Sequence, residues 1–491
     1  MHFKWAGAAS LAGMLLGAGF LLPGLWFLAL VGIVPLLAAL KESRAFSAAA
    51  LYGWITSFVI SLLALAPIFW GTLPLDWYGI SSLSAQWFLV GGSWVLASAV
   101  LALGGSAFGV FVHWYGSDSW KDVLIVPAAW VVSEWLGSLL FSVIGAGPGS
   151  FIGAHFTLHY IGYILANDPP LLQLAWLGDV YALSFAGLAI GVLIYRVIYA
   201  SSIKERRVLS VCAVLIMCVW IAAHPLVKYW STVSRVATKN SASSLSLAAV
   251  SRYAPPLFLP SGDEERQRFE ALRALITPLH DIDVLVFPEN AVFLRSIPEE
   301  ESSAVENELR EIGVNNTPPL SIDSEDIREA DGFLYSRLAY TGGDASVVYS
   351  YKQFLLPLGE YTPYVYRVLL KLFGGEILLE KVVRVRGYAQ GPFADTASFR
   401  GAELGARFCD EAMSPELYRQ QVVQGAHVLV NLSSQSWFHG SRLVYEEMKQ
   451  VARVRAVSLG RWYVQSGNMA PAFVLDEYGQ IVGETQWGIP Q

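Results

Sequence analysis

The chain has 491 residues, of which 54% are hydrophobic and only 15% are charged. This composition is too apolar for an ordinary soluble protein and too charged for a protein made only of membrane helices. The net charge of −7, without a basic patch that contains interleaved aromatic residues, argues against nucleic acid as a partner.

Long apolar runs fill the first half of the chain. A bilayer-spanning helix needs about 20 residues, and seven runs approach or exceed that length: 6–21, 23–40, 47–70, 86–112, 122–145, 170–195 and 207–226. We therefore predict a membrane domain over residues 1–230, followed by a polar linker over residues 231–245. An uncleaved first helix is favoured over a signal peptide, because a second apolar run follows directly after Pro23-Gly24.

Basic residues alternate between the predicted loops. The loops on one side contain Lys4, Lys41, Arg44, Lys121, Arg196, Lys204, Arg206 and Arg207. The intervening loops, 72–85 and 146–169, contain no Lys or Arg. Since basic loops stay in the cytoplasm, the chain after about residue 228 is expected outside it, which in a bacterium is the periplasm.

Polar groups inside the apolar runs need separate interpretation. Glu134 is the one acidic residue in the middle of such a run, and we favour an internal hydrogen-bonding role over a direct role in handling lipid. Cys212 and Cys218 fall in the last run, and we expect two buried, inert thiols there rather than a disulfide.

From Ser246 onward, short apolar runs alternate with amphipathic stretches, which is typical of a layered α/β domain over residues 246–491. Strands are expected at 245–250, 284–287, 332–340, 346–351, 427–432, 462–466 and 472–476. Helices are expected at 263–279, 302–312, 415–424 and 445–459. A short strand-like stretch, Arg407-Phe408, leads to Cys409. Catalytic residues are expected at such strand ends.

Three residues in this half form a candidate catalytic set. Cys409 is the only cysteine outside the apolar half, Glu289 ends the apolar run 284–288, and Lys352 follows the run 349–351. A single cysteine, glutamate or lysine in such a position is more often a structural or solvent-exposed residue. Together, however, the three residues supply the nucleophile and the acid–base groups of an acylated-cysteine enzyme. Glu289 can move protons, and Lys352 with the backbone N–H of Asp410 can stabilise an oxyanion. No metal or other cofactor is expected, since His427 and His439 lack further ligands at zinc-like spacing.

A family resemblance is carried by three motifs in order: Pro288-Glu289-Asn290-Ala291, the segment Lys352 to Pro363, and Phe408-Cys409-Asp410-Glu411. They resemble the nitrilase (carbon-nitrogen hydrolase) superfamily. Behind a multi-span membrane block, they are similar to the apolipoprotein N-acyltransferase family. The stretches 130–136, 430–438 and 453–468 extend the resemblance over nearly the whole chain.

The resemblance implies a multi-span α-helical membrane domain followed by an α/β nitrilase-like domain, an αββα sandwich. It implies a Glu289, Lys352 and Cys409 triad, with Glu360 positioning Lys352 or a proton and Glu411 supporting the nucleophile turn. The implied reaction moves an acyl chain from a membrane phospholipid, through a thioester, to the amine of diacylglyceryl-cysteine in apolipoproteins. The implied location is the bacterial inner membrane, with the catalytic domain on the periplasmic side.

Two alternatives remain open: a membrane-tethered amidase that uses the same three residues, and a non-catalytic lipid-binding relative. The second is kept open by departures from the family pattern. Gly137 stands where the family usually has Arg, Asp410 where it has Tyr, and Ser434-Gln435 where it has Asn-Asp. The resemblance also implies a membrane helix after the catalytic domain, and the sequence up to Gln491 contains none.

The segment Tyr364 to Leu379 is unusually apolar for a stretch so close to Lys352. We predict an amphipathic element that lies in the lipid interface, with Arg367 and Lys371 at the headgroups. Packing of this segment onto the domain core is the alternative.

Overall fold

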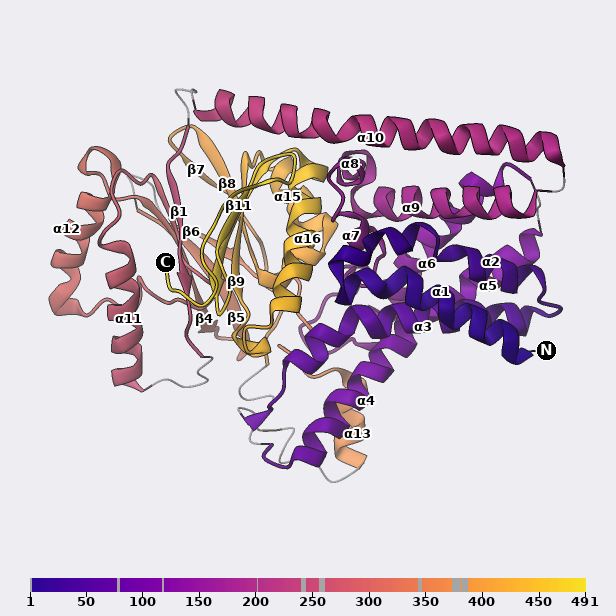
Figure 1. The fold of residues 1–491 in the computed structure, drawn as a ribbon. Helices are drawn as coiled ribbons and strands as arrows, with labels where there is room; N and C mark the ends of the chain where they lie inside the picture. The colour runs from indigo at the N-terminus through magenta and orange to yellow at the C-terminus, as the bar shows by residue number, and fades with distance from the viewer. Residues whose placement is uncertain are drawn as a thin grey trace. The chain divides into compact units, whose positions relative to one another are not determined.

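The computed structural model describes residues 2–76, 80–116, 119–200, 202–239, 244–255, 261–342, 347–372, 380 and 387–491. The chain divides into two compact units (Figure 1). A helical unit contains Met1–Ile144, Gly153–Thr232 and Glu446–Ser458, and a second unit contains Gly145–Ile152, Val233–Tyr445 and Leu459–Gln491.

Among the described residues, seven segments are long and apolar enough to cross a membrane, the number that the sequence predicts. The elements of the helical unit are α1 (His2–Leu21), η1 (Pro23–Leu30), α2 (Ile33–Lys41), α3 (Phe46–Gly71), α4 (Leu83–Leu101), α5 (Leu103–Tyr115), α6 (Asp122–Ile144), α7 (Gly162–Leu165), α8 (Pro169–Leu172), α9 (Ala175–Tyr199) and most of α10 (Ile203–Lys239). Two of the seven are composite: η1 with α2, and α4 with α5.

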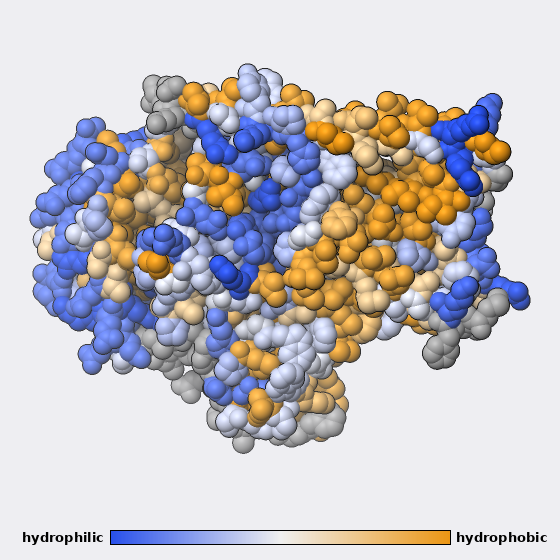
Figure 2. Space-filling model, in the orientation of Figure 1, coloured by the Kyte–Doolittle hydropathy of each residue, from blue (hydrophilic) through white to orange (hydrophobic). Residues whose placement is uncertain are grey.

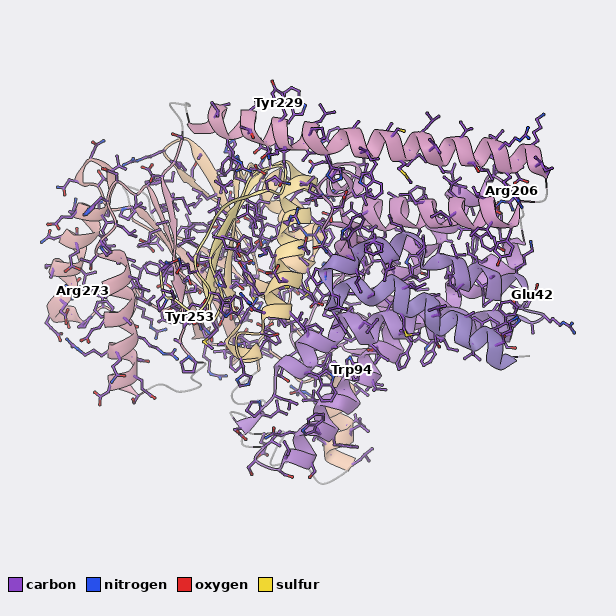
Figure 3. The ribbon with its side chains drawn as sticks, viewed as in Figure 1. Glu42, Trp94, Arg206, Tyr229, Tyr253 and Arg273 are labelled. Carbon is purple, nitrogen blue, oxygen red and sulfur yellow. The ribbon has the colours of Figure 1, made fainter. Side chains whose placement is uncertain are left out.

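Charged loops meet at one end of the helical unit. Glu42, which follows α2, and Arg206, near the start of α10, lie at the same end of the bundle in Figure 3. The buried Arg196 at the end of α9 lies 3.6 Å from Asp122 of α6 and 2.5 Å from Glu205 of α10. The alternation of loops with and without Lys or Arg stays a prediction about sidedness.

Helix α10 is held to the helical unit at few points. Trp220 donates a 2.8 Å hydrogen bond to Asp168, but only 6% of the 18-residue apolar window within Ile203–Ala237 is buried. Figure 2 shows apolar side chains spread over the visible face of this unit. The prediction of two buried thiols is wrong, because Cys212 and Cys218 are exposed on this helix. Apolar sequence alone does not distinguish a side chain that faces protein from one that faces lipid.

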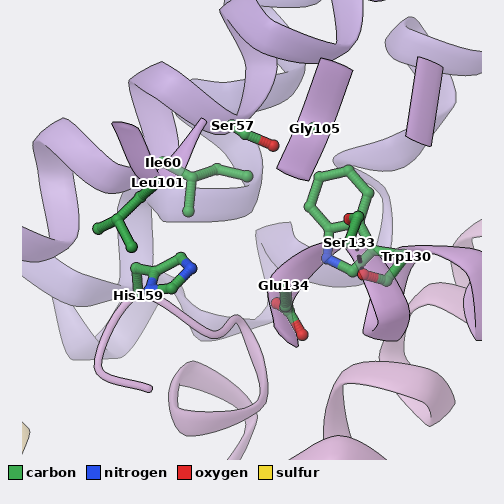
Figure 4. Close-up of a pocket in the computed structure, with 8 residues that line it drawn as sticks. All are labelled: Ser57, Ile60, Leu101, Gly105, Trp130, Ser133, Glu134 and His159. Atoms are coloured by element: carbon green, nitrogen blue, oxygen red, sulfur yellow. Dashed lines mark hydrogen bonds between the residues drawn. The ribbon is translucent and has the colours of Figure 1, made fainter. Parts of the chain in front are cut away.

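Glu134 is buried in α6 and accepts a 3.0 Å hydrogen bond from the backbone N–H of Ile161, as an internal hydrogen-bonding group would. It borders a cavity of about 10 Å³, together with Trp130, Ser133 and His159 (Figure 4). This is room for about one water molecule. Nearby, a Cβ atom added at Gly137 would lie 2.5 Å from the carbonyl oxygen of Leu101, so a larger residue there would require a helix shift.

The second unit contains two sheets. The five-stranded sheet has the order β1-β3-β4-β5-β6, and the seven-stranded sheet has the order β12-β11-β10-β9-β8-β7, with β2 paired to β10. The strands are β1 (Leu247–Ala249), β2 (Ser251–Arg252), β3 (Val284–Val286), β4 (Leu320–Arg328), β5 (Leu334–Thr341), β6 (Val348–Tyr351), β7 (Ala397–Phe399), β8 (Ala402–Phe408), β9 (Val428–Ser434), β10 (Trp462–Asn468), β11 (Phe473–Leu475) and β12 (Ile481–Glu484). The main helices are α11 (Gly262–Ile276), α12 (Ser302–Ile312), α13 (Tyr364–Leu372) and α15 (Pro415–Val423). Helix α16 (Arg442–Leu459) begins in this unit, but its residues Glu446–Ser458 belong to the helical unit.

The two sheets pack face to face. One core contains residues from both, including Val286 and Ile322 of the first sheet and Phe408 and Val430 of the second. A second core joins α11 and α12 to the outer face of the first sheet (Figure 1). Tyr418 of α15 donates a hydrogen bond to the carbonyl of Val430 on the outer face of the second sheet. The predicted αββα sandwich is therefore confirmed.

The sequence did not predict strand β4, because its nine residues include four charged ones. The structure pairs these charges: Glu325 lies 2.6 Å from Arg337 of the neighbouring strand, and Asp323 accepts a hydrogen bond from the backbone N–H of Leu294. Paired charges allow a charged strand to lie inside a sheet. Helix α10 also continues to Lys239, so the polar stretch that begins at Ser231 is largely helical.

Candidate active site

Three strand ends carry the predicted catalytic residues. Glu289 follows β3 by three residues, Lys352 follows β6 directly, and Cys409 follows β8 and begins the short helix η5 (Cys409–Met413). Strands β3 and β6 belong to the five-stranded sheet and β8 to the seven-stranded sheet. The site therefore forms where the two sheets end together, and it depends on their packing.

The backbone is strained at all three places. Non-glycine residues with positive φ are rare, yet φ is +54° at Val292 after Glu289, +66° at Leu358 before Glu360, and +20° at Cys409 itself. Such strain persists only where the surrounding structure imposes it, and it is concentrated at functional sites. Each of the three loops is thus held in one conformation.

Lys352 is the centre of an ion cluster. Its side chain is 3% exposed, and its Nζ lies 2.5 Å from Glu360, 2.5 Å from Asp410 and 3.6 Å from Glu289. One ammonium thus meets three carboxyl groups. From the sequence, only the backbone N–H of Asp410 was expected to take part. The structure shows that its side chain also pairs with Lys352.

Glu411 connects the nucleophile turn to the lysine segment. It is fully buried, and one carboxylate oxygen accepts hydrogen bonds from the backbone N–H groups of Gln353 and Phe354, at 2.7 and 3.2 Å. The other oxygen accepts from the N–H of Phe408 at 3.0 Å. Glu411 therefore fixes the position of Cys409 relative to Lys352, and it contacts neither of their reacting atoms in this structure.

The thiol of Cys409 lies beside the end of the neighbouring strand β9. Its Sγ is 3.5 Å from Ser433 Oγ and 3.7 Å from the carbonyl oxygen of Ser434, as expected from the parallel pairing of Phe408 with Leu432. Ser433 was missed from the sequence, and the only available signal was the register of two adjacent parallel strands. Ser434 was noted only as a departure from the family pattern.

Burial sets the protonation of the site. Burial raises the pKa of Glu289 to about 7, although Lys352 opposes the shift. Burial also raises the pKa of the Cys409 thiol, with further contributions from Glu289 and Asp410. Burial lowers the pKa of Lys352, but Asp410, Glu360 and Glu289 outweigh it and raise that pKa well above its usual value. The resting site thus holds a neutral thiol, a charged lysine and a carboxyl that titrates near neutrality.

The loop that carries Glu289 is supported from β4. Asn290 donates from its backbone to Ser324 Oγ at 2.9 Å and from its side chain to Asp326 at 2.9 Å. The buried Arg252 donates to the carbonyl of Asn290 at 2.8 Å. These supporting residues were not found from the sequence, because β4 was not predicted.

Helix α13 begins a few residues after Glu360. Its apolar side chains Tyr364, Val365, Val368, Leu369 and Leu372 are all exposed, and none of its residues is buried. Packing of this helix onto the core is therefore wrong, whereas its contact with lipid remains a prediction. Residues 373–379 of the predicted interfacial segment lie outside the described residues.

Two family models match this chain. The model described as the apolipoprotein N-acyltransferase N-terminal domain matches residues 12–193, and the carbon-nitrogen hydrolase model matches residues 247–490. An apolipoprotein N-acyltransferase from Geobacter metallireducens is 25% identical over 97% of this chain and 86% of that protein. One from Vibrio cholerae is 26% identical over 97% of this chain and 88% of that protein.

Among solved structures, an amidase from Nesterenkonia sp. covers 50% of this chain and 87% of its own, with a TM-score of 0.34 and 15% sequence identity.

Proposed function

From the premise that this chain belongs to the apolipoprotein N-acyltransferase family, we propose that it transfers an acyl chain from a membrane phospholipid to the N-terminal amine of a diacylglyceryl-cysteine. The observation that carries the proposal is the buried Lys352 cluster beside Cys409, in a chain with seven segments able to cross a membrane. The likeness of both halves to family models supports the same assignment.

The first half-reaction loads the thiol. Glu289 takes the proton of Cys409, whose raised pKa means that a base must act during the attack. Sulfur attacks the ester carbonyl of the phospholipid, and the charge on the carbonyl oxygen is stabilised by Lys352 and the backbone N–H of Asp410. When the carbon–oxygen bond breaks, the lysophospholipid alkoxide takes the proton back from Glu289, and the thioester remains.

The second half-reaction discharges the thioester. The amine of the acceptor attacks the thioester carbonyl and gives a proton to Glu289. The carbon–sulfur bond then breaks, and the thiolate takes that proton. The products are an amide on the acceptor and a free Cys409, so the enzyme returns to its starting state. Glu360 and Glu411 act as positioning residues, because Glu360 holds Lys352 and Glu411 holds the two loops together.

The proposed location follows from the charge pattern of the membrane unit. With the basic loops in the cytoplasm, the catalytic domain lies on the periplasmic side of the bacterial inner membrane. There the thiol has access to phospholipid and to lipoproteins that have crossed the membrane.

Complementation tests the proposal against its alternatives. In a bacterium that lacks lipoprotein N-acylation, the wild-type chain should restore N-acylated lipoproteins and Cys409→Ala should not. Rescue by both would favour a non-catalytic scaffold, and rescue by neither would favour an amidase or an inactive relative. Mass spectrometry of a lipoprotein N-terminus provides the measurement.

The pH dependence of thioester formation should report Glu289. Since the base works as a carboxylate and its pKa is raised to about 7, the rate should rise tenfold per pH unit below about 7 and level off above it. Glu289→Gln should remove this dependence and lower the rate by about 10²–10⁴-fold. An unchanged profile in that variant would exclude Glu289 as the base.

The same group predicts an opposite trend in stability. Because the folded pKa of about 7 exceeds the ordinary 4.5, the folded state binds the extra proton between these pH values. The free energy of unfolding should therefore fall as the pH rises from about 4.5 to about 7, and remain level above that. Melting temperatures of wild type and Glu289→Gln across this range provide the comparison, and the variant should lack this component.

Helix α13 should contribute through its exposed apolar side chains. Val368→Glu should lower the rate on phospholipid vesicles about tenfold, since a buried valine contributes about 1.5 kcal/mol or more to lipid contact. Val423→Glu on α15 is the control, because Val423 is also exposed, at 80%, but lies on another helix of the same unit. Equal effects of the two changes would exclude a special role for α13.

A further inference from the structure

A cavity of about 260 Å³ lies within the second unit, beside the loop that carries Glu360. The side chains that line it include those of Pro148, Arg328, Asp331, Phe333, Tyr361, Arg367 and Tyr388. None of these residues belongs to the triad, and the proposed mechanism uses none of them. The volume is below the range of about 300–1,000 Å³ for pockets that enclose drug-sized ligands, so the cavity suits a small polar group.

Four different chain segments build this cavity. Arg328 ends β4, Arg367 lies on α13, Tyr388 follows in the chain, and Pro148 belongs to the loop Gly145–Ile152. That loop is tied into the unit: Tyr361 donates to the carbonyl of Gly145 at 2.9 Å, and the N–H of Tyr364 donates to Ala146 at 2.8 Å. The cavity is therefore a built feature and not a gap beside one flexible side chain.

The charge of the lining favours an anion. The lining contains two guanidinium groups and one carboxylate, that of Asp331. Asp331 already accepts hydrogen bonds from the N–H of Phe333 and the hydroxyl of Tyr335, at 3.0 and 2.7 Å. Arg328 and Arg367 are each oriented by a backbone carbonyl, of Gly332 at 2.6 Å and of Thr362 at 3.0 Å. Oriented guanidinium groups are the usual ligands of phosphate oxygens.

The position of the cavity links it to the acyl donor. Tyr361 is the neighbour of Glu360, whose carboxylate is 2.5 Å from Lys352, and the N–H of Tyr388 donates to the carbonyl of Glu360 at 3.2 Å. Arg367 lies on the helix with the exposed apolar face, and the loop that contains Pro148 follows directly on the membrane segment that ends at Ile144. A phosphate bound here would therefore lie on the same helix as an exposed apolar face, and only a few residues along the chain from a segment able to cross a membrane.

We propose that this cavity binds the phosphodiester headgroup of the acyl-donor phospholipid, with Arg328 and Arg367 as its cations. The inference rests on the proposed function. The headgroup would then lie beside the loop of Glu360, whose carboxylate is 2.5 Å from Lys352, and the ester of the same lipid would extend from there towards Cys409. The cavity thus gives the enzyme a preference for phospholipid over a neutral lipid that carries the same acyl esters.

The test compares two donors in vesicles of neutral carrier lipid. For the wild type, formation of the Cys409 thioester should be at least about tenfold faster from phospholipid than from diacylglycerol, because a charged hydrogen bond is lost with the phosphate. In Arg328→Ala and Arg367→Ala, that ratio should fall towards one. The loss should appear in the KM for phospholipid, with kcat and the rate from diacylglycerol unchanged. Arg419→Ala, which removes an exposed charge on α15 outside the cavity, should retain the wild-type ratio.

The outcomes separate the two levels of inference. No acyl adduct in the wild type from either donor would contradict the proposed function itself. An adduct that forms equally fast from both donors, or a ratio unchanged in both arginine variants, would overturn the headgroup site alone. Inorganic phosphate should leave the wild-type rate unchanged. If inorganic phosphate instead lowered the rate of the wild type but not that of the arginine variants, the cavity would be assigned to free phosphate.

Discussion

Cys409→Ala should abolish the covalent acyl adduct that forms when the purified protein is incubated with phospholipid vesicles. Sulfur is the atom that bonds to the acyl carbon, and removal of an active-site nucleophile costs about 10⁶ in kcat in a well-studied hydrolase. Intact-protein mass spectrometry should show the mass of one acyl chain on the wild type and none on the variant. Peptide mapping should place that mass on the segment that contains Cys409.

The chain supplies its own control for this experiment. Cys218 on α10 is an exposed cysteine in an apolar segment able to cross a membrane, so it is the thiol that lipid contact alone would acylate. Cys218→Ala should retain the full adduct. An adduct that survives Cys409→Ala and disappears in Cys218→Ala would mean that acylation depends on lipid contact, and the proposed mechanism would be wrong.

Lys352→Met should cost both activity and stability. Loss of the ammonium leaves Glu289, Glu360 and Asp410 in a buried site without their counter-charge. Removal of one partner from a buried ion pair costs about 3–5 kcal/mol, which corresponds to about 6–20 °C in melting temperature for a domain of this size. The rate of thioester formation should fall by about 10²–10³-fold, because an oxyanion donor is lost. Thermal unfolding in detergent and adduct formation would measure the two effects.

A second change separates the two losses. Asp410→Asn in the Lys352→Met background removes one of the stranded carboxyl groups and preserves the shape of the side chain. It should recover part of the melting temperature and none of the activity, since no ammonium returns to the site. Recovery of activity in the double variant would show that Lys352 serves only to neutralise Asp410.

The sequence predicted the main residues of the candidate site, but it did not predict the contacts that surround them. Cys409, Glu289 and Lys352 were identified from motifs at strand ends, and the structure brings all three to the ends of β8, β3 and β6. Glu360 and Glu411 came from the family resemblance; Glu360 accepts a hydrogen bond from Lys352, and Glu411 accepts one from the backbone N–H of Gln353. By contrast, the ion pair of Asp410 and the contact with Ser433 depend on which strands are neighbours, and a linear pattern does not contain that information.

Charge patterns had limits for the same reason. Strand β4 lies in the centre of its sheet, but it was not predicted, because acidic residues are depleted in strands. Once Arg337 and the Leu294 backbone are placed beside them, the same residues are paired inside the sheet. The cavity beside Tyr361 was also out of reach of the sequence, since its arginines lie 39 positions apart by their numbers and meet only after folding.

The sequence by itself determined the two-part plan of the protein, its seven apolar segments, its layered α/β domain and its candidate nucleophile. These follow from hydrophobic run length, from periodicity and from short motifs, which are all local properties of a chain. Only the tertiary structure decided the protonation of the site and the partners of Lys352. The reason is physical: a pKa shift and an ion pair depend on burial and on atoms distant in sequence, and both arise only when the two sheets pack together.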